Sequence, residues 1–314
     1  MTQLGLARLD DPRGVFYAAG AYVMWGLVTI YWKWLGSVPS VEVLAHRIAW
    51  GLVVAMLLVA ATGRMRHIVN LLRRPRIVAL MTLTALLIGG NWYLFIWSVV
   101  EGRVLETSLG YYINPLVSIL LGALLLGERL SRLRKIAFAL AAAAVAFQII
   151  MLGELPWISL CLAFSFGIYG YLRKVAPVES LDGFFIETLI LAPLAIAWLV
   201  HLANTGALQF GAQGTEIDLL LLGAGPVTAV PLLLFAAAAR RVRLSTMGFV
   251  QYAAPTISFL LAVFVWHEPF GLARAVTFTL IWIALALVSW EAFANERQFR
   301  AGRIKAKRAV ANPD

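Results

Sequence analysis

Cysteine and charge are the two scarcest features of this 314-residue sequence. The single cysteine, Cys161, excludes an intramolecular disulfide and a cysteine-based metal cluster. Charged residues make up 13% of the chain, whereas soluble domains carry roughly 25%. The sequence also has no HExxH, GxSxG or P-loop pattern and no cluster of aspartates. We therefore predict no catalytic residues, no metal site and no cofactor.

The chain is rich in long runs of apolar residues. The chain is 61% hydrophobic, with a mean hydropathy of +0.84. A helix that crosses the hydrocarbon core needs about 20 apolar residues, and the runs are too continuous for barrel strands, which alternate over ~10 residues. The sequence predicts an all-α polytopic membrane protein with ten transmembrane helices, at about residues 14–35, 41–62, 77–99, 105–126, 135–152, 155–172, 181–201, 217–238, 245–266 and 272–293.

The basic residues are unevenly divided between alternate loops. If the N-terminus is cytoplasmic, the loops on the opposite side hold only Lys33, Arg103 and Arg274. Because cytoplasmic loops carry an excess of Lys and Arg, both termini are predicted to be cytoplasmic. This topology explains the net charge of +10, so no nucleic-acid partner is expected. The bilayer and a small-molecule substrate are the predicted partners, and residues 294–314 are expected to form a basic cytoplasmic tail.

One offset of 140 residues aligns two long stretches of the chain. It matches Arg103 with Arg243, Pro115 with Pro255, and Glu128 with Glu268. We interpret residues 14–152 and 155–293 as two repeats of five helices each. Because five is odd, the second repeat enters the membrane the other way up. Inverted repeats are typical of secondary transporters, whose substrate site lies at the repeat interface.

Several stretches resemble the RarD branch of the drug/metabolite transporter superfamily, a branch named for chloramphenicol sensitivity. Among them are LIGGNWYLFIWSV, LETSLGYYINPLVSILLGALLLGERL and RLSTMGFVQYAAPTISFLLAVFVWHEPF. The resemblance covers about residues 14–292. It implies two EamA-type five-helix repeats, cytoplasmic termini and a location in the bacterial inner (plasma) membrane, and it names no substrate.

Polar and aromatic residues gather around the two matched prolines. Pro115 and Pro255 interrupt symmetry-related helices, and such breaks are tolerated where a cavity or a neighbour satisfies the freed carbonyl. A substrate cavity is one interpretation; polar contacts between helices and an aromatic belt at the interface are the other. On the cavity interpretation, the predicted substrate-binding residues are Asn91, Trp92, Tyr111, Asn114, Gln251, Tyr252 and Trp25.

Ionisable residues at membrane depth are costly and suggest function. Arg47 and Glu187 occupy matched positions with opposite charge, so we predict that they form one pair in the bundle interior, either for gating or as a structural ion pair. His46 is a candidate proton relay; the alternative is a packing residue near the end of its helix. Glu128 and Glu268 are expected to be solvated loop residues.

These features favour a secondary transporter that moves small metabolites or drugs by alternating access, most simply an exporter. Two alternatives remain: an intramembrane enzyme and a channel. An enzyme would need a nucleophile, a metal cluster or paired carboxylates, and a channel would need filter loops or charged rings. We therefore predict that the protein is not an enzyme.

Overall fold

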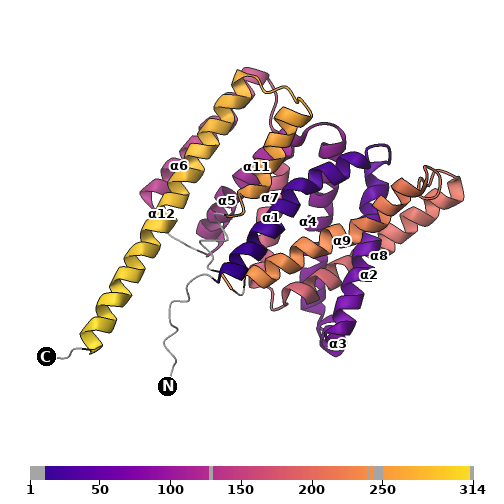
Figure 1. Cartoon of the computed structure of the whole chain (residues 1–314), viewed down its shortest axis with the longest axis horizontal. Helices are drawn as coiled ribbons and strands as arrows, with labels where there is room; N and C mark the ends of the chain where they lie inside the picture. The colour runs from indigo at the N-terminus through magenta and orange to yellow at the C-terminus, as the bar shows by residue number, and fades with distance from the viewer. Residues whose placement is uncertain (1–10, 127–129, 240, 243–249, 312–314) are drawn as a thin grey trace. The chain divides into compact units, whose positions relative to one another are not determined.

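A computed structural model of the chain describes residues 11–126, 130–239, 241–242 and 250–311, and every regular element in these ranges is helical (Figure 1). The helices are α1 (Pro12–Trp34), α2 (Ser40–Ala61), α3 (Met65–Leu72), α4 (Pro75–Val100), α5 (Val104–Leu126), α6 (Arg132–Leu152), α7 (Trp157–Val175), α8 (Ser180–Thr205), α9 (Thr215–Ala239), α11 (Ala253–Leu260), the π-helix η1 (Leu261–Val265) and α12 (Leu272–Ala311).

Eight of these helices are long and apolar enough to cross a membrane: α1, α2, α4, α5, α6, α8, α9 and α12. The all-helical class is thus confirmed, and eight of the ten predicted spans are supported within the described residues. The other two predicted spans fall on α7, whose last turn holds Arg173 and Lys174, and on the shorter apolar helix Ala253–Val265. That these two also cross the membrane stays a prediction.

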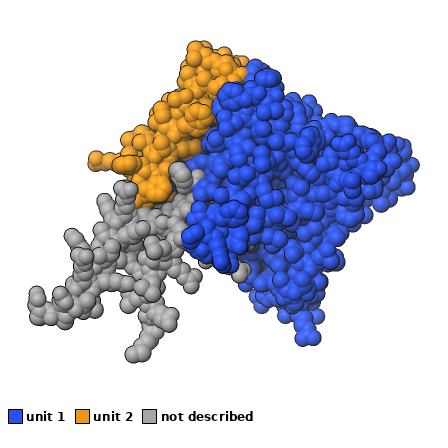
Figure 2. Space-filling view, viewed as in Figure 1, with its two compact units in different colours: residues 1–122, 157–269 blue, residues 123–156, 270–314 orange. Residues whose placement is uncertain are grey.

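The chain forms two compact units (Figure 2). Unit 2 consists of Ala123–Pro156 and Phe270–Asp314. In it, α6 packs along α12, and a small polar cluster joins the two helices. The Glu291 carboxylate accepts a hydrogen bond from the Ser131 hydroxyl at 2.8 Å and lies 3.4 Å from Nε of Arg134. Helix α12 continues to Ala311, past the end of its apolar segment.

Unit 1 consists of Met1–Gly122 and Trp157–Pro269. Here α2 packs against α8 and α9, α1 packs against α9 and α11, and α4 packs against α7 and α8. Small residues permit this close approach, as is typical of membrane helices. At Gly225, for example, an added Cβ would lie only 2.6 Å from the backbone oxygen of Trp50.

Helices α2 and α8 run antiparallel. Arg64, just after the end of α2, contacts Asp182 in the first turn of α8. At the other end, Glu42 in the first turn of α2 contacts Gln209, just after the end of α8. The start of each helix is therefore tied to the end of the other.

Candidate functional site

Arg47 lies between two tryptophans in unit 1. Its guanidinium carbon is 4.1 Å from the ring centroid of Trp92 on α4 and 5.2 Å from that of Trp32 on α1. Nε of Arg47 is buried without a hydrogen-bond partner, and within the described ranges no carboxylate forms an ion pair with this guanidinium. Cation–π contacts contribute about 0.5–2 kcal/mol, but they leave the N–H donors of the guanidinium unused.

Glu187 has a different partner from the one the sequence predicted. Its carboxylate lies 3.7 Å from Nε of Arg173 and accepts a hydrogen bond from the Tyr169 hydroxyl at 3.2 Å. The predicted pair of Arg47 with Glu187 is therefore wrong for this structure. The reason is that α7 supplies a cation close to Glu187, whereas Arg47 turns toward the aromatic rings of α1 and α4.

His46 sits one residue before Arg47 and is almost fully buried. Its Nδ1 accepts a hydrogen bond from the Trp50 indole at 3.2 Å, and its ring stacks on Phe210 at 5.2 Å. Nε2 of His46 is buried and has no hydrogen-bond partner within the described part of the chain. Its proposed role as a proton relay stays a prediction.

Two predicted asparagines each present a buried side-chain oxygen, Oδ1, that has no hydrogen-bond partner among the described residues. The amide nitrogen of Asn91 donates to the backbone oxygen of Leu162 at 3.1 Å and to the Ser165 hydroxyl at 2.9 Å, which fastens α4 to α7. Asn114 lies one turn after Tyr111 on α5. Tyr111 is close enough to Arg47 for an electrostatic interaction, so α2, α4 and α5 bring Arg47, Trp92 and Tyr111 together.

The remaining predicted residues lie in aromatic contacts elsewhere in unit 1. Tyr252 stacks with Tyr112 of α5 at 6.5 Å. Trp25 packs against Tyr22 at 5.3 Å and against Phe235 of α9 at 5.8 Å. Gln251 is half-buried directly before Tyr252. That Gln251, Tyr252 and Trp25 face the same space as Asn114 stays a prediction.

Two fully buried carboxylates hold the ends of α2 and α8, and no role was predicted for either. Glu42 accepts hydrogen bonds from the backbone N–H groups of Gln209 at 2.8 Å and Phe210 at 3.2 Å. Asp182 accepts two hydrogen bonds from the Arg64 guanidinium, at 2.8 and 2.7 Å. One sequence signal could have found them: the offset that defines the repeat matches Glu42 with Asp182, and both fall in the first turn of a helix.

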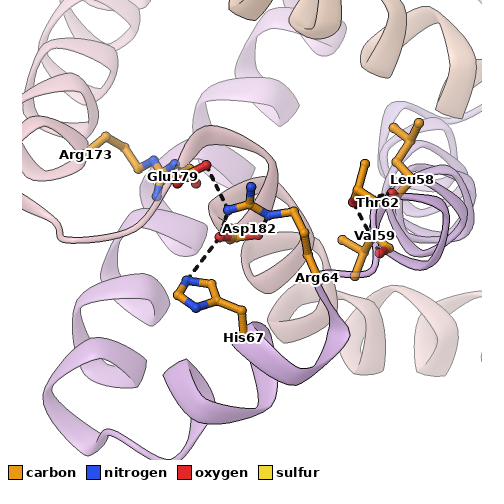
Figure 3. Close-up of polar contacts among 8 residues, drawn as sticks. All are labelled: Leu58, Val59, Thr62, Arg64, His67, Arg173, Glu179 and Asp182. Carbon is orange, nitrogen blue, oxygen red and sulfur yellow. Dashed lines mark hydrogen bonds and ion pairs between the residues drawn. The ribbon is translucent and has the colours of Figure 1, made fainter.

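Further charges surround the Arg64–Asp182 contact (Figure 3). Arg64 also lies 2.8 Å from the Glu179 carboxylate, and Nε2 of His67 lies 3.5 Å from Asp182. The hydrogen bond to Asp182 raises the pKa of Arg64, and Glu179 adds to this effect. Arg64 is therefore positively charged at neutral pH. The result is a network between α8 and the segment after α2.

Glu268 is also buried, so the expectation that it is a solvated loop residue is wrong. Its two carboxylate oxygens accept from the backbone N–H groups of Val104 at 2.7 Å and Leu105 at 2.9 Å. The first N–H groups of a helix lack partners within the helix, and Glu268 satisfies two of them at the start of α5. His267 makes the preceding turn with φ of 51°. The matched Glu128 lies outside the described residues.

Comparison with known proteins identifies the family of the chain. The family model of the EamA-like transporter family matches residues 12–150. An uncharacterized transporter of Vibrio cholerae is 46% identical, covering 89% of this chain and 93% of its own length. Protein RarD of Escherichia coli is 43% identical, covering 91% and 97%. The chain belongs to the RarD branch of the EamA transporter family. It is thus a multi-pass membrane transporter. A crystal structure with 20% identity and a TM-score of 0.57, covering 90% of this chain and 98% of that chain, shares the fold.

Proposed function

We propose that this protein is a secondary transporter that exports small molecules across the bacterial inner membrane by alternating access. Its ten helices form two inverted repeats, residues 14–152 and 155–293, with both termini in the cytoplasm. The reciprocal contacts of Glu42 and Asp182 carry the proposal. They lie at opposite ends of the antiparallel pair α2 and α8, as an alternating mechanism requires of its two closures.

Symmetry is the reason that these contacts support an inverted repeat. Glu42 begins a helix of the first repeat and binds the segment that follows the matched helix of the second repeat. Asp182 begins that second helix and binds Arg64, which follows the first. A two-fold axis in the membrane plane exchanges such contacts. Each repeat therefore closes against the other at both faces.

A third contact set joins the start of α5 to α11. In addition to the Glu268 cap, the Ser108 hydroxyl donates to the backbone oxygen of Pro255 at 2.7 Å, and the hydroxyls of Tyr112 and Thr256 lie 2.7 Å apart. These groups close the face at which α5 begins. In the proposed cycle they separate when that face opens.

The substrate is proposed to bind between the repeats, beside the proline-containing helices. Arg47, Trp92 and Tyr111 form the group that the geometry brings together, and Asn91 and Asn114 each offer an unpartnered carbonyl oxygen. Gln251, Tyr252 and Trp25 complete the proposed site from the side of α1 and α11. Glu187, held by Arg173 and Tyr169, and His46 are proposed to couple or gate transport.

The test uses purified protein in proteoliposomes preloaded with a mixture of bacterial metabolites. After incubation, mass spectrometry compares the internal and external compounds with those of protein-free liposomes. A secondary transporter moves some compounds unchanged and catalyses their counterflow, whereas an enzyme changes their mass and a channel gives no counterflow. If no compound moves beyond the protein-free level, the proposed function is wrong.

A further inference from the structure

We propose that Arg47 binds the negatively charged group of the transported molecule, so that the substrate is a small organic anion. This inference rests on the proposed transport function and adds to it the charge class of the substrate. The observation behind it is a guanidinium deep in the protein with two aromatic neighbours and, among the residues that the structure describes, no carboxylate paired with it.

The position of Arg47 makes an unpaired charge costly. It is the eighth residue of α2, which at about 1.5 Å per residue places it roughly 10 Å into the helix. Charged residues at such depth normally pair with each other, with backbone carbonyls or with a ligand. Glu187, the acid at the matched position, is already neutralised by Arg173. Neither protein partner is therefore present for Arg47 within the described part of unit 1.

The surroundings of the guanidinium suit a ligand. The ring centroids of Trp92 and Trp32 lie 4.1 and 5.2 Å from the guanidinium carbon, and an indole ring offers no lone-pair acceptor for the N–H donors of the arginine. A carboxylate or phosphate accepts two such donors at once. Arg47 also keeps some accessible surface although protein surrounds it. Among the described residues the buried Nε of Arg47 has no hydrogen-bond partner, so its donor can serve a group that enters the bundle.

The neighbouring groups can hold the rest of such a molecule. Tyr111 lies within electrostatic range of Arg47, and Asn114 follows it by one turn on α5. Phe95 and Phe166 pack on Tyr111 at 5.6 and 6.2 Å. An anion with an apolar body matches this combination of one cation, amide groups and aromatic rings. An organic cation would meet an unscreened positive charge.

The first experiment measures ligand binding to the purified full-length protein through the fluorescence of its 11 tryptophans. The probes are benzoate, phenyl phosphate, benzamide and benzylamine, which share one ring and differ in charge. We expect at least one of the two anions to bind at least tenfold more tightly than benzamide and benzylamine. The order of benzoate and phenyl phosphate then tells a carboxylate substrate from a phosphate substrate.

Three variants test the role of Arg47. Arg47→Gln should weaken anion binding by at least tenfold, and Arg47→Lys, which keeps the charge, should retain part of it. Arg76→Gln removes an exposed guanidinium that lies at the start of α4, and it should bind like the wild type. Elution as a single peak in size-exclusion chromatography identifies variants that fold. If Arg47→Gln does not fold, the comparison of anion binding by Arg47→Lys and by Arg76→Gln still tests the role of Arg47. Arg47→Lys should bind the anion more weakly than Arg76→Gln.

The transport assay distinguishes failure of this inference from failure of the proposed transport function. In the proteoliposome assay, the compounds moved by the wild type should be anions at neutral pH. Movement of only neutral or cationic compounds, or binding of neither anion more tightly than benzamide, or no binding of any probe, would overturn the anion assignment and leave the transporter function standing. If the wild type moves nothing, it is the proposed function that fails.

Discussion

Substitution of Arg64 by alanine should destabilise the protein strongly, because it leaves a buried charge without its partner. Asp182 is 0% exposed and accepts both of its short hydrogen bonds, of 2.8 and 2.7 Å, from this guanidinium. Removing one member of a buried pair costs about 3–5 kcal/mol. Since the Arg64 side chain is 28% exposed and His67 remains 3.5 Å away, water and the imidazole relieve part of the cost. We therefore expect about 3 kcal/mol.

The controls follow from the same network (Figure 3). Glu179→Ala removes a partner that is 63% exposed, so its effect should stay below about 1 kcal/mol. Arg66→Ala removes an exposed arginine of α3 and should change almost nothing. Arg64→Ala combined with Asp182→Asn should recover part of the loss, because the stranded charge is gone. Thermal unfolding in one detergent, followed by tryptophan fluorescence, ranks these proteins. Equal midpoints for Arg64→Ala and Arg66→Ala would refute the reasoning.

Three further predictions concern two backbone positions and one side-chain cap. Gly225→Ala should destabilise by about 1–3 kcal/mol, because the added Cβ meets the backbone of Trp50 at 2.6 Å; Gly90→Ala, with nothing within 4 Å, should not lower the unfolding midpoint, and equal effects would contradict this. His267→Gly should stabilise by about 1 kcal/mol in the same assay, since only glycine adopts a φ of 51° without strain; a lower midpoint would count against it. Glu268→Ala should cost about 1–2 kcal/mol and reduce counterflow, because α5 loses its cap; wild-type counterflow would exclude a gating role.

Much of the helical pattern could be predicted from hydrophobicity alone. The predicted span 41–62 agrees with α2 (Ser40–Ala61), and the span 77–99 agrees with α4 (Pro75–Val100). Both predictions succeed because the length of a span is fixed by the bilayer and its ends are marked by polar residues. The short helix α3 (Met65–Leu72) was missed. Its eight residues include too few apolar groups for a span, and only Ile68 and Leu71 are buried.

The polar contacts were harder to predict because their partners come from distant parts of the chain. Glu268 follows a predicted span and was expected to face solvent. In the folded chain, the left-handed turn at His267 sends it back toward the start of α5, 163 residues away from Leu105 in sequence. Sequence spacing carries no signal for such a contact. The burial of an acid at a helix end depends on which N–H groups the fold brings there.

The predicted pair of Arg47 and Glu187 failed for a related reason. Matched positions in an inverted repeat can meet near the symmetry axis only if both side chains point toward it. A helix of 3.6 residues per turn changes side-chain direction by about 100° per residue, so a small rotation decides the partner. Here Glu187 reaches Arg173 of α7, while Arg47 stacks on Trp92 of α4. Opposite charge at matched positions was therefore not enough to predict which residues form an ion pair.

The contacts at the two ends of the α2–α8 pair differ in chemistry, and this difference predicts how each end responds to salt. At one end of the α2–α8 pair, Asp182 depends on one arginine side chain, and exposed groups surround it. At the other end, Glu42 binds backbone N–H groups of Gln209 and Phe210, which are fixed in the chain. A side-chain ion pair near water weakens as salt rises, whereas hydrogen bonds from buried backbone groups respond much less. Rising salt is therefore expected to loosen the Asp182 end of the α2–α8 pair more than the Glu42 end.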